Sequence, residues 1–168
     1  FIKKEVSFNT VNSTAIFSNC LTYRYSITRK WNSSGDKLLF ILLNPSIATE
    51  QINDPTLKRC ENRAIRLGFK QFRVCNLFAF RSTNPINLNN ALDAVGPQND
   101  EILKDSINWS DKIICSWGRL GTFMDRNLKV KKILQESGKP IFHLGLTKNL
   151  QPKHLLYISF KKLPIKWF

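Results

Sequence analysis

The sequence predicts an α/β protein, a three-layer α/β/α sandwich built on a four-stranded parallel sheet with an N-terminal β-hairpin. Two observations favour this class. Four short apolar segments alternate with longer stretches of helical character, a pattern typical of βα units. Each apolar segment also ends in a small polar cluster, and ligands of open parallel sheets bind outside the carboxyl ends of the strands. We therefore expect the functional residues at that edge.

The four expected strands and their polar clusters follow one another along the chain. Residues 37–43 lead into Asn44-Pro45-Ser46, 72–75 into Asn76, 112–115 into Ser116-Trp117-Gly118, and 140–144 into Gly145. Ahead of them, residues 14–31 alternate aromatic or β-branched with polar side chains, which predicts an antiparallel hairpin.

Helix signals lie between the expected strands. Asp54 and Pro55 are typical of a helix N-terminus, and Gly68 suits its C-terminal cap. Further helices are expected at roughly 98–109 and 122–136, and a long loop from residue 81 to about 97. Loops of that length are often functional. No repeat or linker divides residues 1–168, so we expect a single domain.

The chain is strongly basic, with a net charge of +14. From Asp111 to Phe168 there are 12 Lys or Arg residues against 3 Asp or Glu residues. This excess suits a polyanion, most simply nucleic acid, although charge also serves solubility. We expect DNA as the partner and a monomeric protein.

Other classes lack their signatures. No apolar run approaches the ~18 residues that a membrane span needs, so no membrane partner is expected. The four cysteines are isolated, which indicates a reduced, cytoplasmic protein without a metal site. Phosphate-binding loops, dinucleotide fingerprints and serine nucleophile elbows are absent, and no cofactor is expected.

Two asparagines follow the first two expected strands. Pro45 forces a turn that presents Asn44, whose amide can hold a water or a ligand edge, although taken alone the motif is better explained as an ordinary Asn-Pro turn. Asn76 can read a base edge through its donor and acceptor. Close to it, Phe78 and Phe80 could stack on a base or belong to the core, and Arg81 could contact a phosphate.

The chain has two histidines. His143 falls within the last expected strand, which favours a structural role. His154 lies in a loop beyond that strand, between basic residues, and is a candidate for chemistry. The acidic candidates are Asp54 and Asp100, which both also fit the starts of helices.

Taken together, these clusters resemble the uracil-DNA glycosylase superfamily. One of its motifs reads Gly-Ile-Asn-Pro-Gly, which is similar to Leu43-Asn44-Pro45-Ser46. An Asn that reads a pyrimidine ends its second strand, as Asn76 does, and a Trp-Gly pair often closes its third, as Trp117-Gly118 does. Its last motif, His-Pro-Ser-Pro-Leu, is similar to His154-Leu155-Leu156.

The chain also resembles a conserved family of unknown function over about residues 14–160. The motifs of that family are Leu-Asn-Pro-Ser, Asp-Pro-Thr, Asn-Leu-Phe-Ala-x-Arg, Gly-Pro-x-Asn-Asp, Trp-Gly and Pro-x-His. They correspond to residues 43–46, 54–56, 76–81, 96–100, 117–118 and 152–154.

The glycosylase resemblance implies a four-stranded parallel sheet between helices and hydrolysis of the N-glycosidic bond of a flipped base in DNA. The base would be uracil-like or a 5-modified pyrimidine, such as a modified base in phage DNA. His154 would stabilise the departing base, Asn44 would hold the attacking water, and Asp54 or Asp100 would supply negative charge near the sugar. The implied base-binding residues are Asn76, Phe78, Phe80 and Ser46. The implied DNA-binding residues are Arg81, Lys148, Lys153, Leu155, Leu156, Lys161 and Lys162, with Leu155 or Leu156 as the wedge.

The chain departs from the family pattern at two positions. Efficient family members have an Asp where this chain has Asn44, and an amide cannot take a proton at neutral pH. Leu155 stands where the family motif has Pro. Two alternatives therefore stay open: a non-catalytic module that binds nucleic acid or a nucleotide, and an enzyme that processes a small nucleoside or nucleotide.

Overall fold

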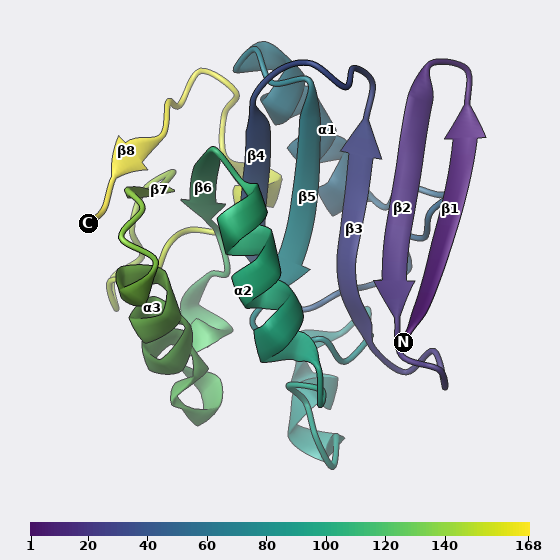
Figure 1. Cartoon of the computed structure of the whole chain (residues 1–168). Coiled ribbons are helices and arrows are strands. Elements are labelled where there is room, and N and C mark those ends of the chain that lie inside the picture. The colour runs from purple at the N-terminus through teal and green to yellow at the C-terminus, as the bar shows by residue number, and fades with distance from the viewer.

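An eight-stranded mixed sheet forms the centre of the computed structural model, which describes residues 1–168 (Figure 1). The strands lie in the order β1-β2-β3-β5-β4-β6-β7-β8. Their bounds are Ile2–Phe8 (β1), Val11–Phe17 (β2), Arg24–Lys30 (β3), Lys37–Leu42 (β4), Gln71–Asn76 (β5), Lys112–Cys115 (β6), Ile141–His143 (β7) and Ile165–Lys166 (β8). The α/β class predicted from the sequence is confirmed.

The four apolar segments form β4, β5, β6 and β7, and these strands are paired in parallel at the centre of the sheet. The sheet is larger than the four parallel strands expected from the sequence, because it has eight strands and is mixed. Antiparallel strands extend the sheet at both ends, because β3 pairs with β5 and β8 pairs with β7. The carboxyl ends of β4 and β5 lie side by side, with Leu42 opposite Asn76.

The hairpin expected at residues 14–31 is present as β2 and β3, which pair antiparallel. It is continuous with the main sheet, since Ile27 of β3 pairs with Val74 of β5. The first strand, β1, was not predicted. Its side chains are mostly exposed, so its sequence lacks the apolar alternation of a half-buried strand.

The expected helices are found as α1 (Pro55–Arg66), α2 (Asn99–Trp109) and α3 (Arg126–Glu136). Asp54 caps α1 and Pro55 begins it, as predicted. The helix expected at 122–136 begins only at Arg126, because Phe123 and Met124, which lie within the preceding η2 segment (Arg119–Asp125), have non-helical dihedral angles. The long loop also contains a short helical segment, η1 (Pro85–Asn90).

Helices cover both faces of the sheet (Figure 1). On one face α1 contributes Leu57, Cys60 and Ala64 to a core with the side chains of β4 and β5. On the other face α2 and α3 form a second core with the opposite side chains of the same strands. No helix has the length and apolar character needed to cross a membrane. No group of three or more His, Cys, Asp or Glu side chains is placed to hold a metal ion.

Candidate functional site

A small polar cavity of about 40 Å³ lies at the carboxyl ends of β4 and β5, beside the N-terminus of α1. It has room for about three water molecules, since each needs roughly 10–15 Å³. The residues that line it are Arg24, Leu42, Asn44, Ser46, Asp54, Thr56, Leu57, Val74, Asn76 and His154. The fold therefore brings together five residues singled out from the sequence: Asn44, Ser46, Asp54, Asn76 and His154.

Asn76 is held rigidly at the end of β5. The side chain of Asn99, the first residue of α2, donates from Nδ2 to the carbonyl oxygens of Asn76 and Leu77, at 3.0 and 3.1 Å. The Asn76 side chain is only 1% exposed, and its Oδ1 atom has no hydrogen-bond partner. An unpaired buried amide oxygen is costly, so Asn76 offers a pre-positioned polar group to a ligand of the cavity.

Asn44 is fixed through one end of its amide. Its Nδ2 atom donates to the carbonyl oxygens of Ser82, at 2.9 Å, and Pro45, at 3.2 Å. Both amide hydrogens are thus occupied by backbone oxygens. The Oδ1 atom accepts no hydrogen bond from the protein and is left to accept one from water or a ligand.

Asp54 caps a helix and also lines the cavity. One carboxylate oxygen, Oδ1, accepts a hydrogen bond from the backbone N–H of Leu57 at 2.8 Å and so caps α1. Asp54 is largely buried, and it lines the cavity together with Thr56 and Leu57 of the first turn of α1. Its second oxygen makes no hydrogen bond within the protein. Asp54 therefore brings one ionisable oxygen to the cavity.

His154 is oriented by its own backbone. Its Nδ1 atom accepts a hydrogen bond from the N–H of Leu156 at 3.3 Å, at the start of η3 (Leu155–Tyr157). Burial lowers the pKa of His154 below 6.5, although the charge of Asp54 opposes this shift. The imidazole is therefore neutral at pH 7, and an accepting Nδ1 places the ring proton on Nε2.

The Trp-Gly cluster after β6 holds the segment that carries His154. Ser116 donates from its hydroxyl to the carbonyl oxygen of Lys153 at 2.6 Å, and the Gly118 N–H donates to that of Pro152 at 2.7 Å. The Trp117 indole N–H donates to Gln151 Oε1 at 2.9 Å. These residues lie close to the cavity, but their role is to position the loop.

Arg24 is the residue of the cavity that sequence reasoning missed. It lies in β3, is 3% exposed, and donates from Nη1 to the carbonyl oxygen of Ala48 at 2.9 Å, while Nε has no partner. Burial lowers its pKa to about 10, opposed by the charge of Asp54, so the guanidinium stays charged at pH 7. No local signal identifies Arg24, because only the pairing of β3 with β5 brings it here.

Asp100 does not line the cavity, so the role near the sugar that the resemblance implied for it is wrong. Its carboxylate pairs with the buried Arg126 and with Lys129. Arg126 in turn donates from Nε to the carbonyl oxygen of Leu77 at 2.7 Å. Burial opposes the ionisation of Asp100, but the hydrogen bonds from Arg126 and Lys129 outweigh it and hold its pKa below the usual value. Asp100 thus supports the backbone that follows Asn76.

Replacing Asp100 by Asn is expected to lower the free energy of unfolding by about 1–3 kcal/mol, because the buried Arg126 loses its charged partner. Since the folded-state pKa of Asp100 is depressed, its contribution is complete above the unfolded pKa, about 3.9, and is lost as pH falls through the folded pKa. Denaturant unfolding at pH 7 and at pH 3 measures both effects. Glu101→Gln, an exposed change in the same helical turn, is the control, and equal stability of the two variants would contradict this role.

Three apolar side chains that were expected to contact a base or DNA do not have the surroundings that such contacts need. Phe78 is fully buried in the core beside Phe123, so it offers no surface to a base. Phe80 packs edge-on against Tyr23 and does not line the cavity. Leu155 is fully buried in the core on the α1 side of the sheet, so it cannot act as a wedge in this conformation. Of the two wedge candidates, only Leu156 is partly exposed.

The predicted basic contacts lie at the surface. Lys148, Lys153, Lys161 and Lys162 are exposed. Arg81 is half-buried, lies over the Phe17 ring and donates to the carbonyl oxygen of Leu21. Arg81 also lines an open hollow of about 390 Å³ together with Ser46, Ser82 and Asn87. Because Ser46 lines both spaces, this outer hollow adjoins the polar cavity.

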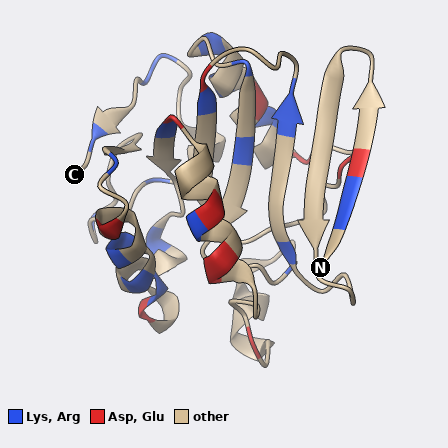
Figure 2. Cartoon of the chain, viewed as in Figure 1, with Lys and Arg blue, Asp and Glu red and all other residues tan.

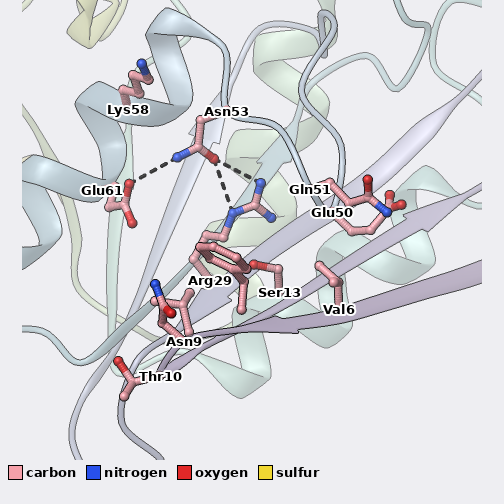
Figure 3. Close-up of a pocket in the computed structure, with 12 residues that line it drawn as sticks. Val6, Asn9, Thr10, Ser13, Arg29, Glu50, Gln51, Asn53, Lys58 and Glu61 are labelled. Atoms are coloured by element: carbon pink, nitrogen blue, oxygen red, sulfur yellow. Dashed lines mark hydrogen bonds between the residues drawn. The ribbon is translucent and has the colours of Figure 1, made fainter.

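A larger hollow of about 680 Å³ lies between the β1–β2 hairpin and α1 (Figure 3). Its central Arg29 donates to Asn53 Oδ1 at 2.9 and 3.2 Å and to the carbonyl oxygen of Thr49 at 2.6 Å. Asn53 donates in turn to Glu61 at 3.0 Å. These central groups satisfy one another, and none of the residues singled out from the sequence lines this hollow. The small polar cavity is therefore the better candidate site.

Comparison with known families adds one finding. The model of the family described as protein of unknown function (DUF1643) matches residues 24–156, which is most of the chain. The chain belongs to the DUF1643 family. Every residue that lines the polar cavity, from Arg24 to His154, lies inside the DUF1643 match, whereas β1 and β2 lie outside it. Among curated proteins, none matches the chain.

Proposed function

We propose that this DUF1643 protein is a DNA glycosylase that hydrolyses the N-glycosidic bond of a uracil-like or 5-modified pyrimidine nucleotide. The observation that carries the proposal is the convergence of Asp54, His154, Asn44 and Asn76 on one buried polar cavity. A carboxylate, a neutral imidazole and two amides supply the groups that such a hydrolysis needs. The net charge of +14 supports a polyanionic substrate.

In the proposed reaction, the bond between C1′ of the sugar and the base nitrogen breaks, and the base departs as an anion. His154 Nε2–H donates a hydrogen bond to the departing base, as donors of an oxyanion hole do. The charged guanidinium of Arg24, in the wall of the same cavity, further favours the anion. The sugar passes through an oxocarbenium-like state, which the negative charge of Asp54 stabilises.

Water completes the reaction. Asn44 Oδ1 accepts a hydrogen bond from the water and so positions it, because the Nδ2 hydrogens of Asn44 are held by backbone oxygens. The water oxygen bonds to C1′, and its proton passes to Asp54. The products are an abasic site and the free base, which takes its proton from solvent. This division of roles assigns the proton to Asp54, since an amide cannot accept it.

Recognition of the base falls to Asn76. Its unpaired Oδ1 atom accepts from an N–H of a pyrimidine edge, and its amide group can also donate to a carbonyl oxygen. The outer hollow, which is lined by Arg81, Ser82 and Asn87, adjoins the cavity at Ser46 and suits the sugar and phosphate. Arg81 keeps its predicted role as a phosphate contact within this proposal.

The test is abasic-site formation on DNA that contains uracil, 5-hydroxymethylpyrimidines or glucosylated pyrimidines, revealed by alkaline cleavage. We expect product on at least one substrate and its loss with Asn44→Ala, which removes the amide that positions the water. The same strand without a modified base is the control for background cleavage. Absence of product on every substrate would reject the glycosylase.

One observation favours a second candidate, a non-catalytic module that binds a modified base. The cavity of about 40 Å³ is smaller than a pyrimidine, so the surrounding loops must move to admit a whole base. A binding module could instead accept only the edge of a base. Specific binding of one modified DNA without an abasic product would support this alternative.

A further inference from the structure

A basic surface lies along α1, the helix whose first turn lines the polar cavity. It is formed by Arg59, Arg63 and Arg66 of α1 together with Lys161 and Lys162, and we call it the α1 basic surface. The three arginines are spaced i, i+4 and i+7, which places them on one side of the helix. Figure 2 shows Lys and Arg both on the helix and on the C-terminal segment.

The C-terminal segment is fastened to α1 through Arg63. The Arg63 guanidinium donates to the carbonyl oxygens of Ile158, Ser159 and Lys162, at 3.0, 3.0 and 2.9 Å, and Arg59 also donates to that of Ile158. The Phe160 ring lies among the three guanidiniums. Its centroid is 3.9 Å from Arg59 Cζ, 5.4 Å from Arg63 Cζ and 4.6 Å from Arg66 Cζ.

Anchoring explains Arg63 and Arg59 but leaves three positive charges that form no ion pair with an acidic side chain. Arg66, Lys161 and Lys162 are exposed, and their side chains make no hydrogen bond to the protein. The three ion pairs of the chain join Lys3 to Glu5 and Asp100 to Arg126 and Lys129, so none neutralises this surface. Burial lowers the pKa of Arg63, and the neighbouring charge of Arg59 lowers it further.

The α1 basic surface has a fixed relation to the polar cavity. Asp54, Thr56 and Leu57 at the start of α1 line the cavity, whereas Arg66 is the last residue of the helix. The helix has 12 residues, which at 1.5 Å per residue span about 18 Å. A nucleic-acid strand advances about 3.4 Å per nucleotide, so this distance corresponds to about five nucleotides.

We propose that the α1 basic surface binds the phosphates of the DNA strand that leaves the polar cavity, about five nucleotides to one side of the target base. This inference rests on the proposed function for its substrate class. It adds the path of the DNA, because the strand would run from the polar cavity along α1 toward Arg66. The fixed C-terminal segment presents Lys161 and Lys162 in advance, which limits the entropy lost on binding.

The test is binding of a fluorescent single-stranded 20-nucleotide DNA without a modified base, measured by anisotropy over a range of salt concentrations. A triple variant, Arg66→Gln with Lys161→Gln and Lys162→Gln, removes three exposed charges without touching the anchoring hydrogen bonds. We expect about tenfold or greater loss of affinity at low salt, and a salt dependence of log K that is shallower by about 2, because each contact contributes about 0.7.

The matched control removes three exposed lysines elsewhere that form no ion pair: Lys104→Gln, Lys132→Gln and Lys166→Gln. It changes the net charge equally and is expected to weaken binding far less. Equal losses in the two variants would overturn the inference, since net charge alone would then explain them, and so would a wild-type protein that binds no DNA.

The two proposals fail separately. If DNA is bound and an abasic site forms, but the triple variant behaves like the control, the α1 basic surface is not the DNA track and the glycosylase stands. If the triple variant loses affinity and no modified DNA yields an abasic site, the track stands and the glycosylase is rejected.

Discussion

Replacing Asp54 by Asn is expected to lower abasic-site formation by about 10²- to 10⁴-fold, the usual contribution of a general base. Asn removes the oxygen that takes the proton of the water, and it removes the negative charge near the sugar. Single-turnover cleavage of the modified DNA that yields an abasic site with the unaltered protein measures this loss. Binding of the same DNA should change little, because Asp54 makes no proposed contact to phosphate.

The substitution is informative because Asp54 also caps α1. Asn and Asp are comparable N-caps, so Asp54→Asn keeps the hydrogen bond to the Leu57 N–H and the free energy of unfolding should stay nearly unchanged. Asp54→Ala removes the cap as well and should cost about 1 kcal/mol. An unchanged rate for Asp54→Asn would show that the carboxylate serves only the helix.

Replacing His154 by Ala is expected to lower the rate of cleavage by about 10²- to 10³-fold, as the removal of one oxyanion-hole donor does. The loss should appear in the single-turnover rate at saturating protein, because the hydrogen bond strengthens as the base departs. His143→Ala is the comparison, since His143 is the other histidine of the chain, is buried, and does not line the cavity. Similar cleavage losses in both variants, at matched folding, would argue against a specific role of His154.

The pH dependence adds a second readout. Because burial depresses the pKa of His154 below 6.5, the neutral ring persists through neutral pH, and its ionisation should not appear as a transition near pH 6.5. The charged form opposes folding, so the free energy of unfolding falls as pH drops from the unfolded pKa through the lowered folded pKa. His154→Gln should remove this part of the acid sensitivity, which paired unfolding measurements at pH 7 and pH 5 would detect.

The candidate site was predictable where local chemistry and strand order agree. Asn44 and Asn76 follow apolar strands, and parallel pairing of β4 with β5 brings such positions together. Asp54 precedes Pro55 at a helix start, which is readable from two adjacent residues. The wrong assignments concern residues whose roles depend on what packs against them. Asp100 and Asp54 both fit the start of a helix in the sequence. Only the ion pair with Arg126, which the tertiary structure forms, shows that Asp100 has a structural role.

The sequence by itself determined the α/β class, the four central strands, the cap of α1 and the placement of polar clusters at strand ends, because these follow from periodicity and from short-range backbone preferences. The tertiary structure alone decided which clusters meet. Arg24 enters the cavity through the pairing of β3 with β5, and His154 enters it through the contacts of residues 151–153 with Trp117 and its neighbours. Such contacts join segments far apart in the chain, and their geometry is set by the packing of the whole sheet.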